Sequence, residues 1–505
     1  MKIKLLSLFS FFITVGSYAQ SSNDALLFSS EELSGTARFV GMGGAFGALG
    51  GDISALKVNP AGSSVFLHNF ASFSLANESY NNEVAFRNGI SERRNNNFHI
   101  PQAGAVFVFN NSNPEATISK FTIGVAYNQK KSLSNRFTAS GDNETSIGDY
   151  FTNLANGVPL ELLDSNSLQD RYIFLGEGNF SGEGFSNTDL QTAYLGYNAF
   201  LFDPASNSDN NTAYTSNVSG NSFFQQYDYR STGLNGEFSV NGSMQLFDNF
   251  YAGLNLNSHF INYERSTRFY EQIGSPSEIN EIVFENNLST IGIGFSFQVG
   301  LIAKVNDLIR LGASYESPTW YSIADETNQY LYSYSNDLGG QEVDPFVTNI
   351  FPNYRLRTPG KLTGSLGLVF GKTGVLSFDY SHKDYSNIHL SQGYDNHMDY
   401  STQNQNFEDN LNAASTYRVG GEYRIKQWSL RGGYRYEESP NSDTMSELNG
   451  YSAGLGYSFG KMRLDFAYDY SSQDYSASLL QTGLQDQAQI NFSRSNYILT
   501  LAIDM

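Results

Sequence analysis

Residues 451–459 read YSAGLGYSF, and this short stretch decides the fold. Its odd positions hold tyrosine, alanine, leucine, tyrosine and phenylalanine, whereas its even positions hold only serine and glycine. One-by-one alternation over about ten residues is typical of a transmembrane barrel strand, in which one face meets lipid and the other meets the lumen. A soluble sheet can carry the same pattern, so the choice depends on the rest of the chain.

The same alternation recurs along most of the chain, interrupted by glycine, asparagine, aspartate and proline. It predicts about fourteen strands, an even number, which bacterial single-chain barrels require. The predicted strands span residues 69–79, 98–109, 119–138, 226–247, 250–270, 287–303, 308–318, 353–371, 374–385, 414–426, 428–438, 449–460, 462–472 and 488–504.

The connections between these strands alternate in length. Tight turns at 247–249, 304–307, 371–373, 425–427 and 460–461 separate long polar connections at 80–97, 139–225, 271–286, 319–352, 386–413, 439–448 and 473–487. Outer-membrane barrels have short periplasmic turns and long extracellular loops, whereas a soluble sandwich has no physical reason to place every long loop at one end. The sequence therefore predicts an all-β fold, a transmembrane antiparallel β-barrel of about fourteen strands.

The alternation also assigns each strand a lipid face and a lumen face. The faces predicted to meet lipid include Leu362, Leu366, Leu368 and Phe370, then Ile291, Ile293, Phe295, Phe297 and Val299, then Leu464, Phe466 and Tyr468. The opposite faces carry Arg310, Glu316, Ser377, Asp379, Arg418, Glu422, Arg424, Arg431, Arg435, Arg463, Asp465 and Asp469. A charge at the lipid midplane costs about 2–4 kcal/mol, so these side chains are predicted to point into the lumen. There they either line a water-filled pore or hold an internal plug.

The first residues predict export. The chain begins with Met1-Lys2-Ile3-Lys4, continues with an apolar run from Leu5 to Val15, and reaches Ser17-Tyr18-Ala19. A basic start, a short apolar run and small residues two apart are typical of a secretory signal peptide, here residues 1–19. The run is well short of the roughly 20 residues that a spanning helix needs.

Composition limits the function classes. The chain has 33 Tyr and 39 Phe with only 16% charged residues, which suits outer-membrane barrels and their aromatic belts. The formal charge of -20 argues against a nucleic-acid partner, and the absence of cysteine excludes a disulfide scaffold. The six histidines have no metal-ligand spacing and no nucleophile motif is present, so we expect no metal, no cofactor and no catalysis.

Residues 20–68 precede the first predicted strand and do not alternate. They contain Arg38, Met42-Gly43-Gly44-Ala45, Asp52-Ile53-Ser54-Ala55 and Asn59-Pro60-Ala61-Gly62. A phosphate-binding loop is a poor explanation of these glycines, because no strand of a βαβ unit precedes them. With these motifs in this order behind a signal peptide, the chain resembles the FadL family of outer-membrane transporters for hydrophobic compounds. The resemblance extends more loosely to LGASYESP at 311–318 and RTPGKL at 357–362.

The resemblance implies a barrel over 69–505 whose lumen is plugged by an N-terminal hatch, residues 20–68. It further implies ligand capture at the extracellular loops and passage through a gap in the barrel wall into the membrane. The hatch or gating residues that it implies are Arg38, Gly43, Gly44, Asp52, Asn59, Pro60 and Ala61. The chain departs from the family in ending with Met505 instead of an aromatic residue, and in its largest loop, 139–225.

Apolar residues within 147–164 recur at roughly helical spacing and are candidates for a ligand pocket at the barrel mouth. They are Phe151, Leu154, Leu160, Leu162 and Leu163. Each methylene moved from water to an apolar site gains about 0.8 kcal/mol, so such a pocket could concentrate a poorly soluble ligand. The alternative is that the helix only packs over the mouth. Arg93, Arg94, Lys130, Lys131 and Arg136 are candidate partners for a ligand carboxylate, or solvated loop charges.

We therefore expect a monomeric protein of the Gram-negative outer membrane that moves a hydrophobic compound, such as a long-chain fatty acid, by passive diffusion. Its expected partners are that ligand, outer-membrane lipids and the barrel-assembly machinery. Two alternatives stay open: a shuttle of type IX secretion, which some barrels resembling this family form, and a general porin. A barrel enzyme such as a surface lipase is a weaker rival, because no nucleophile motif is present.

Overall fold

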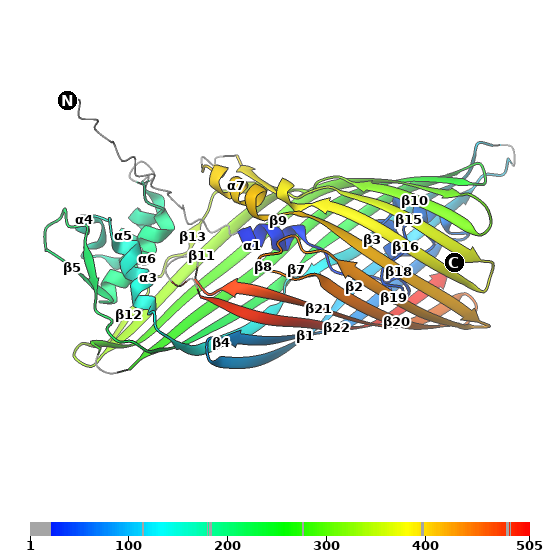
Figure 1. The fold of residues 1–505 in the computed structure, drawn as a ribbon. Helices are drawn as coiled ribbons and strands as arrows, with labels where there is room; N and C mark the ends of the chain where they lie inside the picture. Colours follow the sequence, from blue (N-terminus) through cyan, green and yellow to red (C-terminus); the bar gives the residue numbers. More distant parts are fainter. Residues whose placement is uncertain are drawn as a thin grey trace, which may run out of the picture.

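The computed structural model describes residues 22–113, 116–178, 180, 184–274, 277–394, 398–480, 484 and 486–505. The predicted signal peptide, residues 1–19, lies outside them. The described chain forms a closed antiparallel barrel of fourteen strands around an N-terminal segment with short helices, which confirms the predicted fold class (Figure 1). None of the described helices is long and apolar enough to cross a bilayer.

Each wall strand pairs with its neighbour in antiparallel register. In chain order the wall strands are β1 (Phe70–Phe86), β2 (Gly89–Asn110), β3 (Ile118–Ser132), β7 (Phe223–Leu246), β8 (Phe250–Ile273), β9 (Ile279–Lys304), β10 (Ile309–Glu316), β15 (Lys361–Phe370), β16 (Gly374–Asp384), β18 (Ala413–Ile425), β19 (Trp428–Glu437), β20 (Leu448–Ser458), β21 (Met462–Ser478) and β22 (Gln487–Asp504). The last strand closes on the first, from Phe70 opposite Asp504 to Ala85 opposite Gln489. Closure leaves no free sheet edge, whose backbone N–H and C=O groups would find no hydrogen-bond partner in lipid.

The two faces of the wall are those that the alternation predicts. Leu362, Ile293 and Phe466 are 59%, 68% and 44% exposed on the outside, where they meet lipid. Glu422 and Asp465 are buried on the inside. At the level of these lipid-facing residues, the charged side chains of the lumen therefore surround a plug and do not line an open pore.

Tyrosines mark the extracellular limit of the lipid-facing band. The outer aromatic belt consists of Tyr127, Tyr380, Tyr417, Tyr434, Tyr451, Tyr468 and Tyr497. Neighbouring members are in contact, with ring centroids 5.3 Å apart for Tyr380 and Tyr417 and 5.1 Å apart for Tyr468 and Tyr497. Such amphipathic rings prefer the interface between acyl chains and headgroups.

The strands run further toward the extracellular side than the alternation predicts. Residues 80–97, predicted to be a polar connection, belong to β1 and β2, which are joined by the turn at Arg87 and Asn88. Residues 319–352 likewise contain β11 (Trp320–Ser335), β12 (Gly339–Val343) and β13 (Asn349–Ile350). Beyond the membrane both faces of a strand can meet water, so the alternation that marks a spanning strand is lost there.

Three neighbouring wall strands are interrupted just beyond the outer aromatic belt. The interruptions separate β10 from β11, β14 (Tyr354–Arg357) from β15, and β16 from β17 (His389–Gln392), the last by η4 (Tyr385–Asn387). They lie side by side, because β10 pairs with β15, β11 with β14, and β14 with β17. Pro318 and Pro359 account for the first two, since proline lacks the N–H that a ladder needs.

The longest insertion folds into a helical cap, residues 144–222, between β4 (Asn135–Asn143) and β7. The predicted loop, 139–225, therefore starts and ends within strands. The cap contains α3 (Ile147–Ala155), α4 (Leu160–Leu163), α5 (Leu168–Glu177), α6 (Asn187–Asn198), β5 (Phe202–Pro204) and β6 (Tyr214–Ser216). Its core includes Phe284 of β9 and Leu331 of β11, but also Leu479 and Ala488 from the opposite side of the mouth. The cap therefore spans the end of the barrel opposite the C-terminus (Figure 1).

Candidate functional site

The hatch body, residues 36–66, fills the lumen at the level of the lipid-facing band. It contains α2 (Ala37–Val40), η1 (Ile53–Lys57) and η2 (Pro60–Val65). Its hydrogen bonds reach strands all round the wall: Ala37 N donates to Thr500 Oγ1 of β22 (2.7 Å), Phe46 N to Asp379 Oδ2 of β16 (2.8 Å), and Asn59 Nδ2 to Leu301 O of β9 (2.9 Å). The body is thus held from every side.

Arg38 ties the hatch body to the wall through a buried ion pair. Its Nε lies 2.9 Å from Glu422 Oε2 of β18, and its Nη1 donates to Gly51 O at 3.0 Å. Glu422 also pairs with Arg431 at 2.7 Å and with Arg424 at 2.6 Å. Because buried ions lose hydration, such a network contributes less to net stability than to fixing one arrangement of the parts.

Asp52, Asn59, Pro60 and Ala61 shape the hatch body. Asp52 caps η1 by accepting from Ser54 N at 2.9 Å, and Asn59 caps η2 by accepting from Ala61 N at 3.1 Å. Pro60 stands at the first position of η2, where a missing N–H costs nothing. These motif residues fold the plug and seat it.

Glycines bring the hatch and wall backbones into direct contact. Gly43 and Gly44 have φ values of +62° and +77°, which favour glycine. Opposite them, a Cβ on Gly420 of β18 would lie 2.1 Å from Met42 O, and one on Gly433 of β19 would lie 2.2 Å from Gly43 N. No side chain fits between the two backbones there. The structure gives these hatch residues positions, whereas their role in gating stays a prediction.

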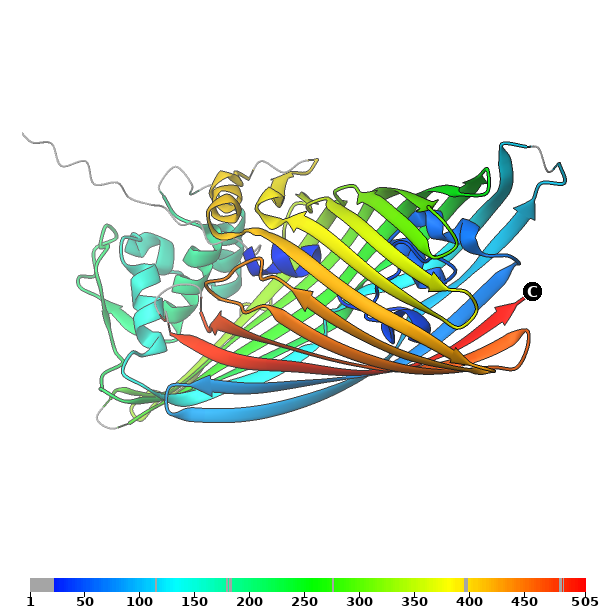
Figure 2. The same ribbon diagram turned by 45° about the vertical axis from the view of Figure 1, so that its right-hand side comes forward.

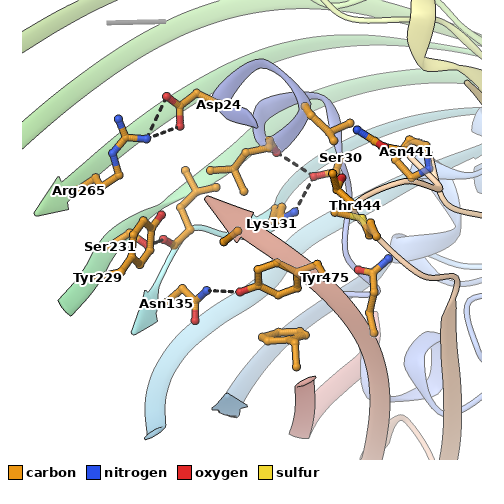
Figure 3. A pocket seen from close by; sticks show the side chains of 18 of the residues that line it. Asp24, Ser30, Lys131, Asn135, Tyr229, Ser231, Arg265, Asn441, Thr444 and Tyr475 are labelled. Carbon is orange, nitrogen blue, oxygen red and sulfur yellow. Dashed lines mark hydrogen bonds and ion pairs between the residues drawn. The ribbon is translucent and has the colours of Figure 1, made fainter. Parts of the chain in front are cut away.

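The hatch arm, residues 22–35, lies on the extracellular side of the body. It begins with α1 (Ser22–Ser29), whose Asp24 meets Arg265 of β8 with both carboxylate oxygens, at 2.9 and 3.1 Å from Nη1. Ser30 Oγ accepts from Lys131 Nζ of β3 at 2.6 Å (Figure 3). Side chains of the wall therefore hold the arm.

Glu31 of the arm sits in a cluster of lysines. Its carboxylate lies 2.8 Å from Lys361 and 3.4 Å from Lys130, and Lys361 also pairs with Glu316 at 2.8 Å. Burial acts to raise the pKa of Glu31, but the charges of Lys361, Lys130 and Lys383 outweigh it and hold that pKa well below its usual range. Sequence analysis missed this cluster, although Glu316 and Lys361 belong to the two loosely matching motifs and stand opposite each other in the sheet.

A cavity of about 640 Å³ lies between the arm, the cap and the extracellular part of the wall. Its size is that of a site for a small organic ligand. Its lining includes Leu26 and Leu27 of the arm and Tyr150 of the cap. Tyr229 and Tyr475 of the wall also line it (Figure 3). The lining therefore offers large apolar surfaces together with polar edges.

Two cations of the lining form no ion pair with the carboxylates that the structure describes. Among the described residues, Lys131 has no ion pair, and its Nζ donates to the neutral Ser30 hydroxyl. Arg418 of β18 also lines the cavity, and its buried Nε finds no acceptor in the described part of the chain. Both side chains are half-buried and lie within electrostatic reach of a carboxylate, Glu32 for Lys131 and Asp379 for Arg418, without forming an ion pair with it. Both are therefore suited to an anionic group of a ligand.

The wall has a seam beside this cavity. The ladder between β2 and β3 covers only Gln102–Asn110, so residues 89–99 of β2 pair with β1 alone among the described strands. The separation begins at two bulges, one in β2 at Ile100 and Pro101 and one in β3 at Lys130. Proline removes a ladder bond, and a bulge turns the strand away from its neighbour.

Side chains bridge the seam in place of a backbone ladder. Arg93 Nε donates to Thr138 Oγ1 at 3.2 Å, and Asn97 Nδ2 donates to Ser132 Oγ at 3.5 Å. The seam starts beyond Tyr127 of the outer aromatic belt and is flanked on the lipid side by exposed Phe98. It thus faces the outer limit of the hydrocarbon.

The residues predicted to bind ligand occupy other places. Phe151 and Leu163 are fully buried in the cap core, with Leu154 and Leu162 packed against it, and none of the four lines the cavity. Arg136 is exposed on β4 beside the seam, outside the cavity lining. The predicted helical segment is two helices, α3 and α4, separated by residues 156–159, and their apolar residues pack within the cap.

A buried row of polar side chains superficially resembles a catalytic triad. Ser296 Oγ lies 2.8 Å from His259 Nε2, and His259 Nδ1 lies 3.7 Å from Glu237 Oε2. Ser296 and His259 are 0% and 1% exposed, so no substrate reaches them. The row serves wall packing.

The sequence profile of the family described as outer membrane protein transport protein (OMPP1/FadL/TodX) matches residues 199–504, more than half of the chain. A FadL homologue of Pseudomonas aeruginosa shares the fold, with 13% identity and a TM-score of 0.56 over 94% of this chain and 99% of that chain. The toluene transporter TodX of Pseudomonas putida has 12% identity and a TM-score of 0.54, again over 94% and 99%. No curated protein matches the sequence. With its hatch-plugged barrel and matching profile, the chain belongs to the FadL/TodX family of non-enzymatic channels for hydrophobic compounds in the Gram-negative outer membrane.

Proposed function

We propose that the protein carries hydrophobic acids such as long-chain fatty acids passively across the lipopolysaccharide layer and releases them sideways into the membrane through the seam. The supporting observation is the continuity of cavity and seam. Leu133, Ser134 and Asn135, which lie where β3 gives way to β4, belong to the lining of the cavity. A ligand in the cavity is therefore next to the one stretch where β2 lacks a ladder with β3 and β4 in the described wall.

The physics of this route favours an amphiphile. The hatch body blocks the axial path, and an apolar chain gains about 0.8 kcal/mol for each methylene that it buries. Tyrosine and leucine surfaces accept that chain, and Lys131 or Arg418 neutralises the carboxylate. At the seam the chain meets the hydrocarbon edge beside Phe98, so leaving sideways needs no return to water.

Substitution of Arg418 tests the ligand class. Arg418→Gln is expected to lower uptake of radiolabelled oleate by cells about tenfold to a hundredfold, because a hydrogen bond to a charged group contributes about 1.5–3 kcal/mol. Uptake of toluene, which has no charge, is expected to stay unchanged. Arg94→Gln, an exposed arginine on β2 outside the cavity lining, is the matched control. Equal loss of oleate and toluene uptake in Arg418→Gln would contradict a role in recognising acids.

The same cells separate the alternatives. A general porin would pass small hydrophilic solutes and give steady ion conductance, which a lumen filled by the hatch body opposes. A secretion shuttle would copurify with an exported protein while the cells take up neither oleate nor toluene.

A further inference from the structure

Between β17 and β18 the barrel wall is not closed by strands. The pairing of β16 with β18 ends at Asp384 opposite Ala413, and beyond that point β17 pairs only with β14 among the described strands. In place of a continuing strand, the chain before β18 forms α7 (Ser401–Asn410). Both ribbon views show α7 lying over this part of the wall with α1 beside it (Figures 1 and 2).

One side chain joins α7 to the open edge of β17. Asn404 Oδ1 accepts from Leu390 N at 2.7 Å, and Asn404 Nδ2 donates to Leu390 O at 2.9 Å. The amide thus takes the place of a neighbouring strand for one residue. A single two-bond clasp of this kind can be broken and remade without disturbing the ladder around it.

The helix itself has little intrinsic stability. Its sequence, STQNQNFEDN, is rich in poor helix formers. In the described chain the N-cap residue Tyr400 makes no side-chain cap bond, and only the Asp399 carboxylate accepts from Ser401 N, at 2.9 Å. Its main apolar anchor is Phe407, which is fully buried in a cluster with Phe28 of the arm and with Ile388 and Leu390. Tertiary contacts, and not helix propensity, therefore hold α7 in place.

The cavity reaches the inner side of α7. Asn406, Asn410 and Leu411 belong to its lining, together with Pro440 and Asn441 of the next loop. The cap, in contrast, closes the axial mouth with a large apolar core. On the extracellular side, α7 is thus a part of the enclosure that side-chain bonds, and not a ladder, join to β17.

We propose that α7 is a side door through which the ligand reaches the cavity from the cell surface. This inference rests on the transport of hydrophobic acids proposed above. When the Asn404 clasp opens, the acyl chain replaces Phe407 against Phe28 and Leu390, and it then slides past α1 into the cavity. The apolar cluster under α7 supplies the path, because a ligand chain can take up the contacts that Phe407 gives up.

A cross-link tests the door. The chain has no cysteine, so Ser391→Cys with Asn404→Cys can be joined specifically by a flexible bismaleimide. We expect the linked protein to take up radiolabelled oleate at least about tenfold more slowly than the same variant blocked by a monofunctional maleimide. If the linked and blocked proteins take up oleate at the same rate, the proposal that the ligand enters at α7 is overturned. If the wild type takes up no oleate at all, it is the proposed function that fails.

Removing the clasp tests the role of Asn404 itself. Asn404→Ala is expected to raise the initial rate of oleate uptake about tenfold, the change that the loss of about 1.4 kcal/mol of closure would give. Gln405→Ala, whose amide bonds to Asp409 within α7, is the matched control and is expected to leave the rate unchanged. If Asn404→Ala and Gln405→Ala take up oleate at the same rate, the two hydrogen bonds of Asn404 do not keep α7 closed, and this part of the proposal is overturned.

Discussion

A methyl group added at Gly420 is expected to unseat the hatch body. The new Cβ would lie 2.1 Å from Met42 O, 2.8 Å from Met42 C and 2.9 Å from Met42 Cβ. The atoms that it meets include backbone of the plug, so the plug has to retreat by about 1 Å to restore ordinary contact, at a cost of about 1–3 kcal/mol. That cost raises the population with a displaced hatch about 5- to 150-fold. The adjacent Gly421 points to the other face, where the nearest atom is 3.6 Å away.

Conductance of single barrels in a planar bilayer measures this displacement. A seated hatch blocks ions, so Gly420→Ala is expected to show current bursts for a fraction of time increased by that factor. Gly421→Ala serves as the control for insertion and for the added methyl group, and it is expected to behave like the wild type. Both variants should keep the heat-dependent gel shift of a folded barrel. Bursts that are equally rare in both variants would refute the idea that the glycine contacts seat the plug.

Three further predictions follow from the buried contacts. Arg38→Met is expected to lower the free energy of unfolding of the barrel with its hatch by about 1–3 kcal/mol. The loss is smaller than for a buried carboxylate left without any partner, because Glu422 keeps its ion pairs with Arg431 and Arg424. Thermal unfolding measures this loss, and an unchanged midpoint would contradict the prediction. Phe151→Ala is expected to cost about 3–5 kcal/mol within the cap core and to make the cap protease-sensitive while the barrel stays intact. The pKa of Glu31 is held well below its usual range, so the stability that its ionised form gives the arm is present at neutral pH and lost only as the pH falls below the usual range of a glutamate. Hydrogen exchange of α1 at pH 7 and about pH 5 should therefore be equally slow after correction for intrinsic rates, and faster exchange at the lower value would show that the lysines do not hold Glu31.

The strands of the wall were predictable because contact with lipid on one face requires apolar residues at every second position. Ile291 and Ile293 alternate with small residues since one face of β9 meets hydrocarbon, and this constraint is readable in a single sequence. Residues 80–97 lack this alternation, because polar side chains are tolerated on both faces of β1 and β2 in their extracellular part. The seam had a local signal that went unused: Pro101 lies within a predicted strand, where proline indicates a missing ladder bond.

The candidate ligand site was less predictable, because its residues come from distant parts of the chain and because an apolar helical pattern fits more than one use. Glu31 and Lys361 are 330 residues apart in the chain, and nothing local in either segment indicates that they meet. The spacing around Phe151 indicated a helix with one buried face, and the structure has such a helix in α3, whereas Leu160, Leu162 and Leu163 belong to the separate helix α4. Amphipathicity shows only that a face is buried, however, and here the cap itself buries it. A pocket for a ligand needs apolar surface left over after packing, which only the assembled structure reveals.

In the proposed route, the division of the hatch into body and arm explains how a plugged barrel can pass a ligand without leaking ions. The body is hydrogen-bonded to strands on every side. The arm lies between the two stretches of the wall that lack a continuous ladder, namely the seam and the part covered by α7. On one side Glu32 Oε2 accepts from Ser132 N of β3 at 3.2 Å, beside the seam. On the other side Lys383 of β16 donates to Ser29 O at 2.6 Å, and Phe28 of α1 packs in the same cluster as Phe407 of α7. A shift of the arm alone would thus change both the door and the seam, while the body below keeps the lumen closed to ions.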